Sequence, residues 1–374
     1  MQAPLFPDDG PPHGPVPTLP ASPTPPTPPT PPTRRISPTS NVRKVRQMHQ
    51  VRPQPPVPAH VRLAAALPRL THLGTSSWTF PGWKGLVWDG DYSDALLSKS
   101  GLAAYAQHPL FSTVSLDRAF YRPLTALQYA GYAAQVGDGF RFSVKAPALV
   151  TDATVRDESG RATQPNTAFL NPELALQEFV QPAMQGLGLK LGALVFQISP
   201  LPSALLADMP TLLQRLATLL QALPSLEALR QAAPDAVVAV EVRDPQWLTP
   251  EFAAVLRAAG ATYCLGLHAK MPPIEGQLPM LRALWPGPLV CRWNLHRSHG
   301  AYGYKDAVKM YLPFDRLVDE DLQTRSTLAR VINAATKAGH PVYATLNNKA
   351  EGSAPLSVAA LAREIVDQRR SVMG

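Results

Sequence analysis

Short apolar runs alternate with longer stretches of helical periodicity from about residue 71 to the carboxyl end of the chain. The short runs are rich in β-branched and aromatic residues, which is typical of strands. Several are apolar at both odd and even positions, as the buried strands of a parallel sheet are. The pattern predicts eight strands, at residues 71–76, 111–116, 140–145, 192–198, 236–242, 261–267, 288–294 and 341–347.

The segments between these strands carry the start and stop signals of helices. Residues 171–173 and 249–251 each place a capping side chain, a proline and a glutamate before an apolar periodic stretch. Residues 203–223 have apolar side chains at helical spacing, and residues 324–341 form a similar stretch that ends in glycine and proline. Strands that alternate with helices in this way predict parallel βα units.

Eight strands and their helices over roughly 280 residues favour an α/β fold of the (β/α)8 TIM-barrel type. An open, doubly wound sheet is the alternative. It is less favoured because no Gly-x-Gly-x-x-Gly follows a strand and no Walker-type Gly-Lys-Ser/Thr is present.

The amino-terminal part of the chain has a different composition. Residues 1–60 hold 19 of the 42 prolines, and residues 21–33 are mostly threonine and proline, which form neither a helix nor a sheet ladder. Residues 1–70 carry eight Arg and Lys against two Asp, so six of the formal net charge of +8 lie there. We expect a disordered, Pro-rich, basic tail at residues 1–68 and a nearly neutral barrel domain at residues 69–370. The tail is either an electrostatic arm for nucleic acid or anionic surfaces, or a solvated linker, or an overextended gene start.

Several classes of protein are disfavoured. No run of about 18 apolar residues is present, and the first residues lack the pattern of a secretory signal, so we expect a cytoplasmic protein without a membrane partner. Cys264 and Cys291 lie in apolar strands and are expected to be reduced core residues. No metal-ligand motif and no Gly-x-Ser-x-Gly elbow is found, so neither a metal, a cofactor nor a serine nucleophile is expected.

Polar residues gather where the predicted strands end. In a TIM-type barrel the carboxyl ends of all strands meet at one face, which carries the active site. The candidate catalytic residues are Glu241 and Lys145. The candidate ligand-binding residues are Arg243, Gln197, Asn347, Asn348, Tyr121, Arg122, Trp78, Asp117, Arg292 and Asn294.

The main candidates each have two interpretations. Glu241 is costly to bury unless it is paired, so it is either a general acid or base or half of a structural ion pair with Arg243. Lys145 either forms a Schiff base in a desolvated site, or it holds an anion or is the partner in a salt bridge. Trp78 either stacks on a sugar or nucleobase or packs on the barrel rim.

Six motifs in this order resemble the domain of unknown function 72 family (YecE-like proteins). They are GTSSWTFPGWKG, TVSLDRAFYRPLT, GFRFSVKAP, LGALVFQISP, AVEVRDPQW and NNKAEGSAPLSVAALA, spread over roughly residues 72–366. The resemblance implies a TIM-type barrel in a bacterial, cytoplasmic protein with no established activity. It also implies that the family's Val-Lys-Ala, Phe-Gln, Glu-x-Arg and Asn-Asn motifs fall on Lys145, Gln197, Glu241 with Arg243, and Asn347 with Asn348.

One position departs from the family pattern. Ser115 stands where the resemblance implies a glutamate in Thr-Val-Glu-Ile-Asn, and Asp117 follows two residues later. A mechanism that needs two carboxylates therefore requires Asp117 to take that role beside Glu241.

The sequence favours a metal-independent enzyme that binds a small polar or anionic metabolite and acts on it by acid/base chemistry. Two alternatives stay open: nucleic-acid binding or processing through the basic tail, and a barrel that binds a ligand or partner without catalysis.

Overall fold

The computed structural model describes residues 50–157, 160–300 and 303–373. The compact unit begins at Val51, so residues 51–68, which the sequence analysis assigned to the tail, belong to the same unit as the barrel. The rest of the tail that we predict to be disordered, residues 1–49, lies outside the described residues. Within the described part of the chain, no helix is long and apolar enough to cross a membrane.

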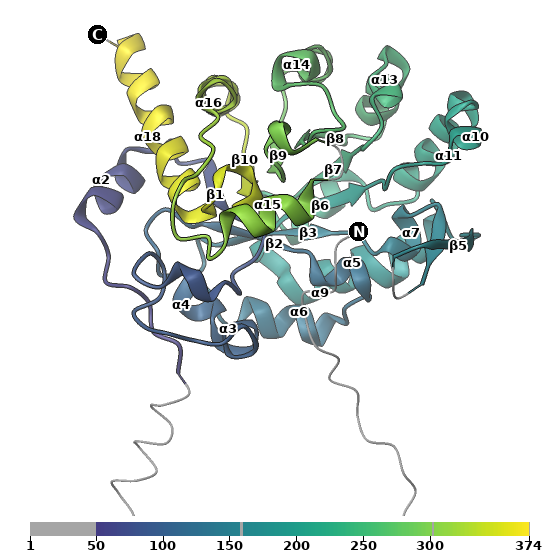
Figure 1. Ribbon diagram of the computed structural model, residues 1–374. Coiled ribbons are helices and arrows are strands. Elements are labelled where there is room, and N and C mark those ends of the chain that lie inside the picture. Colours follow the sequence, from purple (N-terminus) through teal and green to yellow (C-terminus); the bar gives the residue numbers. More distant parts are fainter. Residues whose placement is uncertain (1–49, 158–159, 301–302, 374) are drawn as a thin grey trace, which may run out of the picture. The chain divides into compact units, whose positions relative to one another are not determined.

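Eight parallel strands close into a barrel (Figure 1). Strand β1 pairs with β10 over five residues and with β2 on its other side, which closes the sheet and excludes the open arrangement. Each barrel strand lies within two residues of its predicted range, so the (β/α)8 prediction is confirmed. In barrel order the strands are β1 (Thr71–Thr75), β2 (Thr113–Leu116), β3 (Arg141–Lys145), β6 (Leu191–Gln197), β7 (Val237–Glu241), β8 (Thr262–Leu267), β9 (Leu289–Trp293) and β10 (Val342–Leu346).

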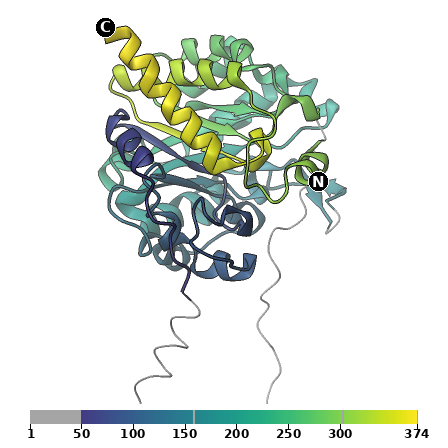
Figure 2. The same ribbon diagram turned by 60° about the vertical axis from the view of Figure 1, so that its left-hand side comes forward.

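Helices surround the strands and connect them, as both views show (Figures 1 and 2). The α-helices are α2 (Pro58–Ala66), α3 (Asp94–Ser100), α4 (Leu102–Tyr105), α5 (Arg118–Tyr121), α6 (Ala126–Ala133), α7 (Ala148–Thr151), α8 (Pro172–Ala175), α9 (Gln181–Leu187), α10 (Ser203–Leu206), α11 (Met209–Gln221), α12 (Leu226–Ala232), α13 (Pro250–Ala258), α14 (Ile274–Ala283), α15 (Tyr304–Tyr311), α16 (Leu322–Lys337), α17 (Asn348–Glu351) and α18 (Ala354–Met373). Shorter turns are η1 (Pro81–Trp83), the π-helical η2 (Leu176–Val180), η3 (Gly188–Lys190), η4 (Pro245–Trp247) and η5 (Arg297–His299).

The helix ends follow the local capping chemistry. The side chains of Asn171 and Thr249 accept hydrogen bonds from the first turns of α8 and α13, as the sequence predicts. The stretch at 203–223 is not one helix but two, α10 and α11. The break occurs because the Asp208 side chain accepts from the Thr211 N–H and so starts a second helix.

Two features outside the barrel were not predicted. The hairpin of β4 (Thr154–Arg156) and β5 (Ala162–Pro165) is short and largely exposed, so it has no apolar pattern that would indicate a strand. The segment before β1 also packs on the fold: the Gln54 N–H donates to the Val87 carbonyl at 2.8 Å, and Val51 is 5 % exposed. Helix α2 lies beside α18 (Figure 2).

The barrel interior is layered along the strand direction. An ion pair between Arg141 and Asp235, 2.7 Å apart, lies at the amino ends of the strands. Above it is an apolar cluster of Ala193, Val195, Val237, Ala239, Cys264, Val290 and Tyr343. Cys264 and Cys291 are both buried free thiols, as predicted. The next inward positions along the strands carry the polar residues of the candidate site.

Candidate functional site

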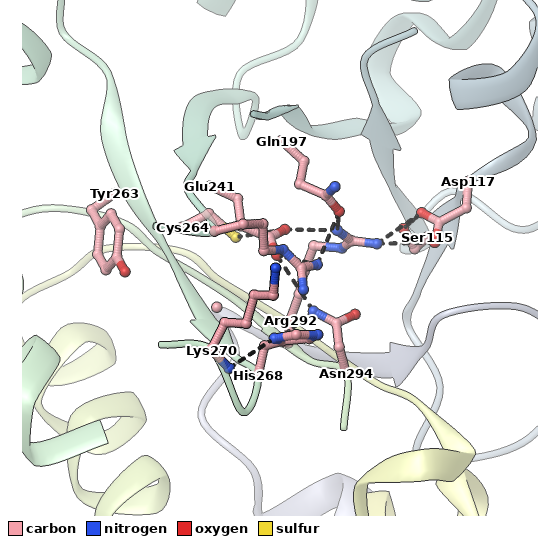
Figure 3. A network of polar contacts seen from close by, with 12 residues as sticks. Ser115, Asp117, Gln197, Glu241, Tyr263, Cys264, His268, Lys270, Arg292 and Asn294 are labelled. Carbon is pink, nitrogen blue, oxygen red and sulfur yellow. Dashed lines mark hydrogen bonds and ion pairs between the residues drawn. The ribbon is translucent and has the colours of Figure 1, made fainter. Parts of the chain in front are cut away.

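The polar residues at the carboxyl ends of the strands meet inside the barrel mouth. Gln197 on β6 and Glu241 on β7 lie opposite each other in the strand register. Alternate residues of a strand face one side, so both share a side with the apolar cluster below them. We call the hydrogen-bonded group at this level the polar network (Figure 3); it consists of Ser115, Asp117, Gln197, Glu241, Arg243, Arg292 and Asn294.

Glu241 is the most enclosed member of the polar network, with 0 % of its surface exposed. Its Oε1 lies 2.7 Å from Arg243 Nη2, and its Oε2 lies 2.6 Å from Arg292 Nη1. The Asn294 amide reaches Oε1 at 3.4 Å. Burial opposes ionisation of this carboxyl, but the two guanidiniums outweigh it and hold the pKa of Glu241 below its ordinary value. Glu241 is therefore an ionised carboxylate with both oxygens occupied.

Arg292 connects the two carboxylates of the polar network. Besides Glu241, it donates to Gln197 Oε1 at 2.8 Å and to both oxygens of Asp117 at 2.9 and 3.1 Å. Ser115 Oγ donates to Asp117 Oδ1 at 2.6 Å. The second carboxylate of the site is thus Asp117, and Ser115 holds it in place.

Two buried lysines flank the polar network. Lys145 ends β3 and is 4 % exposed, and its Nζ lies 3.4 Å from the centre of the Phe120 ring. Burial lowers the pKa of Lys145 to about 7, and Asp117 is the strongest of the groups that oppose this. Burial also lowers the pKa of Lys349, on α17, to about 8, again opposed by Asp117. Lys349 Nζ donates to Asn347 Oδ1 at 3.3 Å.

Tyr304 and His268 also touch this region, and the sequence analysis did not select either of them. Tyr304 on α15 hydrogen-bonds to Arg243, and its ring lies 5.3 Å from that of His268 and 5.7 Å from Lys349 Nζ. Burial lowers the pKa of His268 to about 3, so this imidazole is neutral. Tyr304 gives no signal in the sequence because it lies beyond the strand end, on a helix whose position depends on the tertiary fold.

Besides Lys145, five candidates lie outside the polar network. Trp78 is buried, with its Nε1 donating to the Leu97 carbonyl at 3.1 Å, so the rim-packing interpretation describes it and stacking on a ligand does not. Asn348 Oδ1 accepts from Trp83 Nε1 and from a backbone N–H, which is a structural role. The remaining three are Asn347, which caps α17, and the exposed Tyr121 and Arg122.

The polar network reaches solvent through Asp117, whose side chain is 30 % exposed. Glu241 and Arg292 lie beneath it and are buried. A small cavity is lined by His268, Trp293 and Arg297, among others, but by no member of the polar network. No group of three or more His, Cys, Asp or Glu side chains within the described residues is arranged to hold a metal ion.

Comparisons with known proteins found one family model and several similar solved structures. The family model "Protein of unknown function DUF72" matches residues 72–373. A search of curated proteins found no match. A crystal structure of a DUF72 family protein from Enterococcus faecalis V583 is similar at 17 % identity and a TM-score of 0.49, covering 79 % of this chain and 95 % of that one.

A second similar crystal structure is that of a DUF72 family protein from Thermotoga maritima MSB8. It has 17 % identity and a TM-score of 0.45, with 82 % of this chain and 100 % of that one covered. The family model spans well over half of the sequence and includes all eight barrel strands except the first residue of β1. This protein therefore belongs to the DUF72 family.

Proposed function

We propose that this protein binds a small anionic metabolite at the carboxyl end of its barrel and that Lys145 moves a proton on it. One observation carries the proposal. Around the barrel mouth of the described chain, the cations Arg243, Arg292 and Lys349 accompany only two carboxylates, those of Glu241 and Asp117, and Lys145 adds a further positive charge when it is protonated. An uncompensated buried charge is costly, so an anionic ligand beside this cluster would be stabilised.

The two carboxylates and Lys145 have different roles in this proposal. Glu241 stays ionised and fully paired, so it positions the guanidiniums of Arg243 and Arg292 and does not itself transfer a proton. A group whose pKa lies near the working pH is the best general acid or base. Lys145, with a pKa of about 7, meets that condition. Asp117 is partly exposed and lies where a ligand enters.

Calorimetric titration of the full chain with inorganic phosphate and with glycolate tests anion binding. Ethylene glycol, which has the size of glycolate without the charge, is the matched ligand control. We expect both anions to bind and ethylene glycol not to bind. Lys349→Gln should weaken anion binding by about tenfold, equivalent to roughly 1.4 kcal/mol, while Lys99→Gln, at an exposed lysine on α3, should not. Absence of anion binding to the wild-type chain would contradict the proposal.

A second candidate function is anion binding without turnover. The burial of Lys145, which is 4 % exposed, favours it, because that amine is removed from direct contact with a ligand that enters beside Asp117. Native mass spectrometry of the purified protein, followed by identification of any bound metabolite, separates the two. A metabolite that is recovered chemically unchanged after prolonged incubation with the protein supports binding alone.

A further inference from the structure

We infer that Lys145 forms an imine with a small aldehyde or ketone that carries an anionic group. This inference rests on the proposed function, because the cations around the barrel mouth would hold the anionic group. It adds a covalent step and a substrate class, a carbonyl compound. Proton transfer does not require a buried amine, whereas the formation of an imine gives the burial of the Lys145 amine a role.

The contacts of the two buried lysines differ. Lys349 Nζ has a hydrogen-bond acceptor, Asn347 Oδ1. Lys145 Nζ has no hydrogen bond or ion pair to any residue that the structure describes, and its neighbour is the face of the Phe120 ring at 3.4 Å. An ammonium group has three donors to satisfy, and here none of them has an acceptor among the described residues. Burial without acceptors favours the neutral amine, whereas contact with the Phe120 face favours the charged form. The lone pair of a neutral amine is available for attack on a carbonyl carbon.

The electrostatic environment supports the same chemistry. Burial and the positive charges of Arg292 and Arg243 disfavour protonation of Lys145, while Asp117 and Glu241 favour it. A lysine with a pKa of about 7 has, at neutral pH, roughly a thousandfold larger neutral fraction than an ordinary lysine. When an imine at this position is protonated, the Phe120 face and the Asp117 carboxylate stabilise the positive charge.

The step balances without an oxidant or a reductant. The lone pair of Lys145 Nζ forms a bond to the carbonyl carbon, and one amine proton moves to the carbonyl oxygen. The C–O bond then breaks, and the oxygen leaves as water together with the second amine proton. The products are one imine and one water molecule.

Reductive trapping on the full chain tests the inference. The protein is incubated at pH 7 with cyanoborohydride and one of three aldehydes: glyoxylate, which carries a carboxylate, glycolaldehyde phosphate, or the neutral acetaldehyde. We expect at least one anionic aldehyde to modify Lys145 at a concentration about tenfold below that needed with acetaldehyde. Peptide mapping should find the mass of the probe minus one oxygen atom on Lys145. The two anionic arms separate a carboxylate from a phosphate substrate.

Variants and a parallel binding measurement make each outcome decisive. Lys145→Arg keeps the charge and should remove the adduct at this position, whereas Lys99→Arg, at an exposed site, should leave it. In the wild-type chain, modification of surface lysines with no preference for Lys145 overturns the inference. This result does not depend on the variant, so it holds even where Lys145→Arg fails to fold. If glycolate or phosphate binds but no aldehyde is trapped, the imine is wrong and the proposed function stands. If neither anion binds and none is trapped, both are wrong.

Discussion

Arg292 Nη1 and Glu241 Oε2 lie 2.6 Å apart inside the barrel, although 51 residues separate them in the sequence. The two residues come from β9 and β7, and the strand between them, β8, contributes Gly266 beside the carboxylate. Both side chains are buried, so this ion pair is protected from water and salt. Both residues belong to the polar network, so breaking this ion pair would change both the stability of the barrel mouth and the geometry of the candidate site.

Replacing Glu241 by glutamine will destabilise the protein. The substitution keeps the shape of the side chain but leaves the buried Arg243 and Arg292 without their shared anion. Breaking a buried pair by removing one partner costs about 3–5 kcal/mol. Urea denaturation at pH 7 measures the effect, and Glu227→Gln, at an exposed position on α12, is the control. An unchanged denaturation midpoint would show that Glu241 is not a structural anion.

Gly266→Ala will disturb the polar network through a single methyl group. A Cβ at position 266 would lie 3.3 Å from Glu241 Cγ and Oε1, which is tighter than most contacts of a Cβ atom, so the fully buried Glu241 side chain would have to shift. We expect a loss of about 1–3 kcal/mol in the free energy of unfolding. Gly131→Ala, in α6 with open space around the new methyl group, is the matched control and should stabilise the chain by up to about 1 kcal/mol. Equal effects of the two substitutions would argue against close packing at residue 266.

Lys145→Met will stabilise the protein most at low pH. The pKa of Lys145 is about 7 in the folded chain, against 10.5 for an ordinary lysine. Between these values the unfolded chain binds more protons, so the stability of the wild-type protein rises with pH from about 7 to about 10.5. The increase in the free energy of unfolding that methionine gives, roughly 2–5 kcal/mol below pH 7, should therefore shrink towards pH 10.5.

Urea denaturation of the wild-type and variant chains at pH 6.5, 8 and 10 checks this dependence. Lys99→Met, which replaces an exposed lysine, should show no comparable trend. A stability difference that stays constant over this pH range would mean that Lys145 titrates as an ordinary lysine.

A chain that begins at Gln50 will be more stable than one that begins at Leu70. The shorter chain lacks the buried Val51, the hydrogen bond from Gln54 to Val87, and α2 with its contacts to α18. The loss of this apolar burial should cost about 2–4 kcal/mol. Denaturation midpoints of the two chains provide the comparison, and identical midpoints would exclude a stabilising role for the segment.

The barrel could be predicted because its signals are local. Alternation of apolar runs with capped helices depends on residues close together in the sequence, and all eight barrel strands follow from it. The β4–β5 hairpin and the break at Asp208 escaped prediction because an exposed hairpin has no apolar pattern and a capping aspartate can also lie within a helix. The family resemblance, drawn from six motifs, is confirmed by the family match.

The sequence by itself determined that polar residues would end the strands and, through the barrel topology, that several of them would meet. Only the tertiary structure decided which of them touch and how they are charged. Asp117 contacts Arg292 across 175 residues, and Tyr304 and Lys349 approach from helices outside the strands. Trp78, in contrast, turns into the core. Side-chain burial and pKa depend on neighbours brought together when the barrel closes, and local sequence does not specify those neighbours.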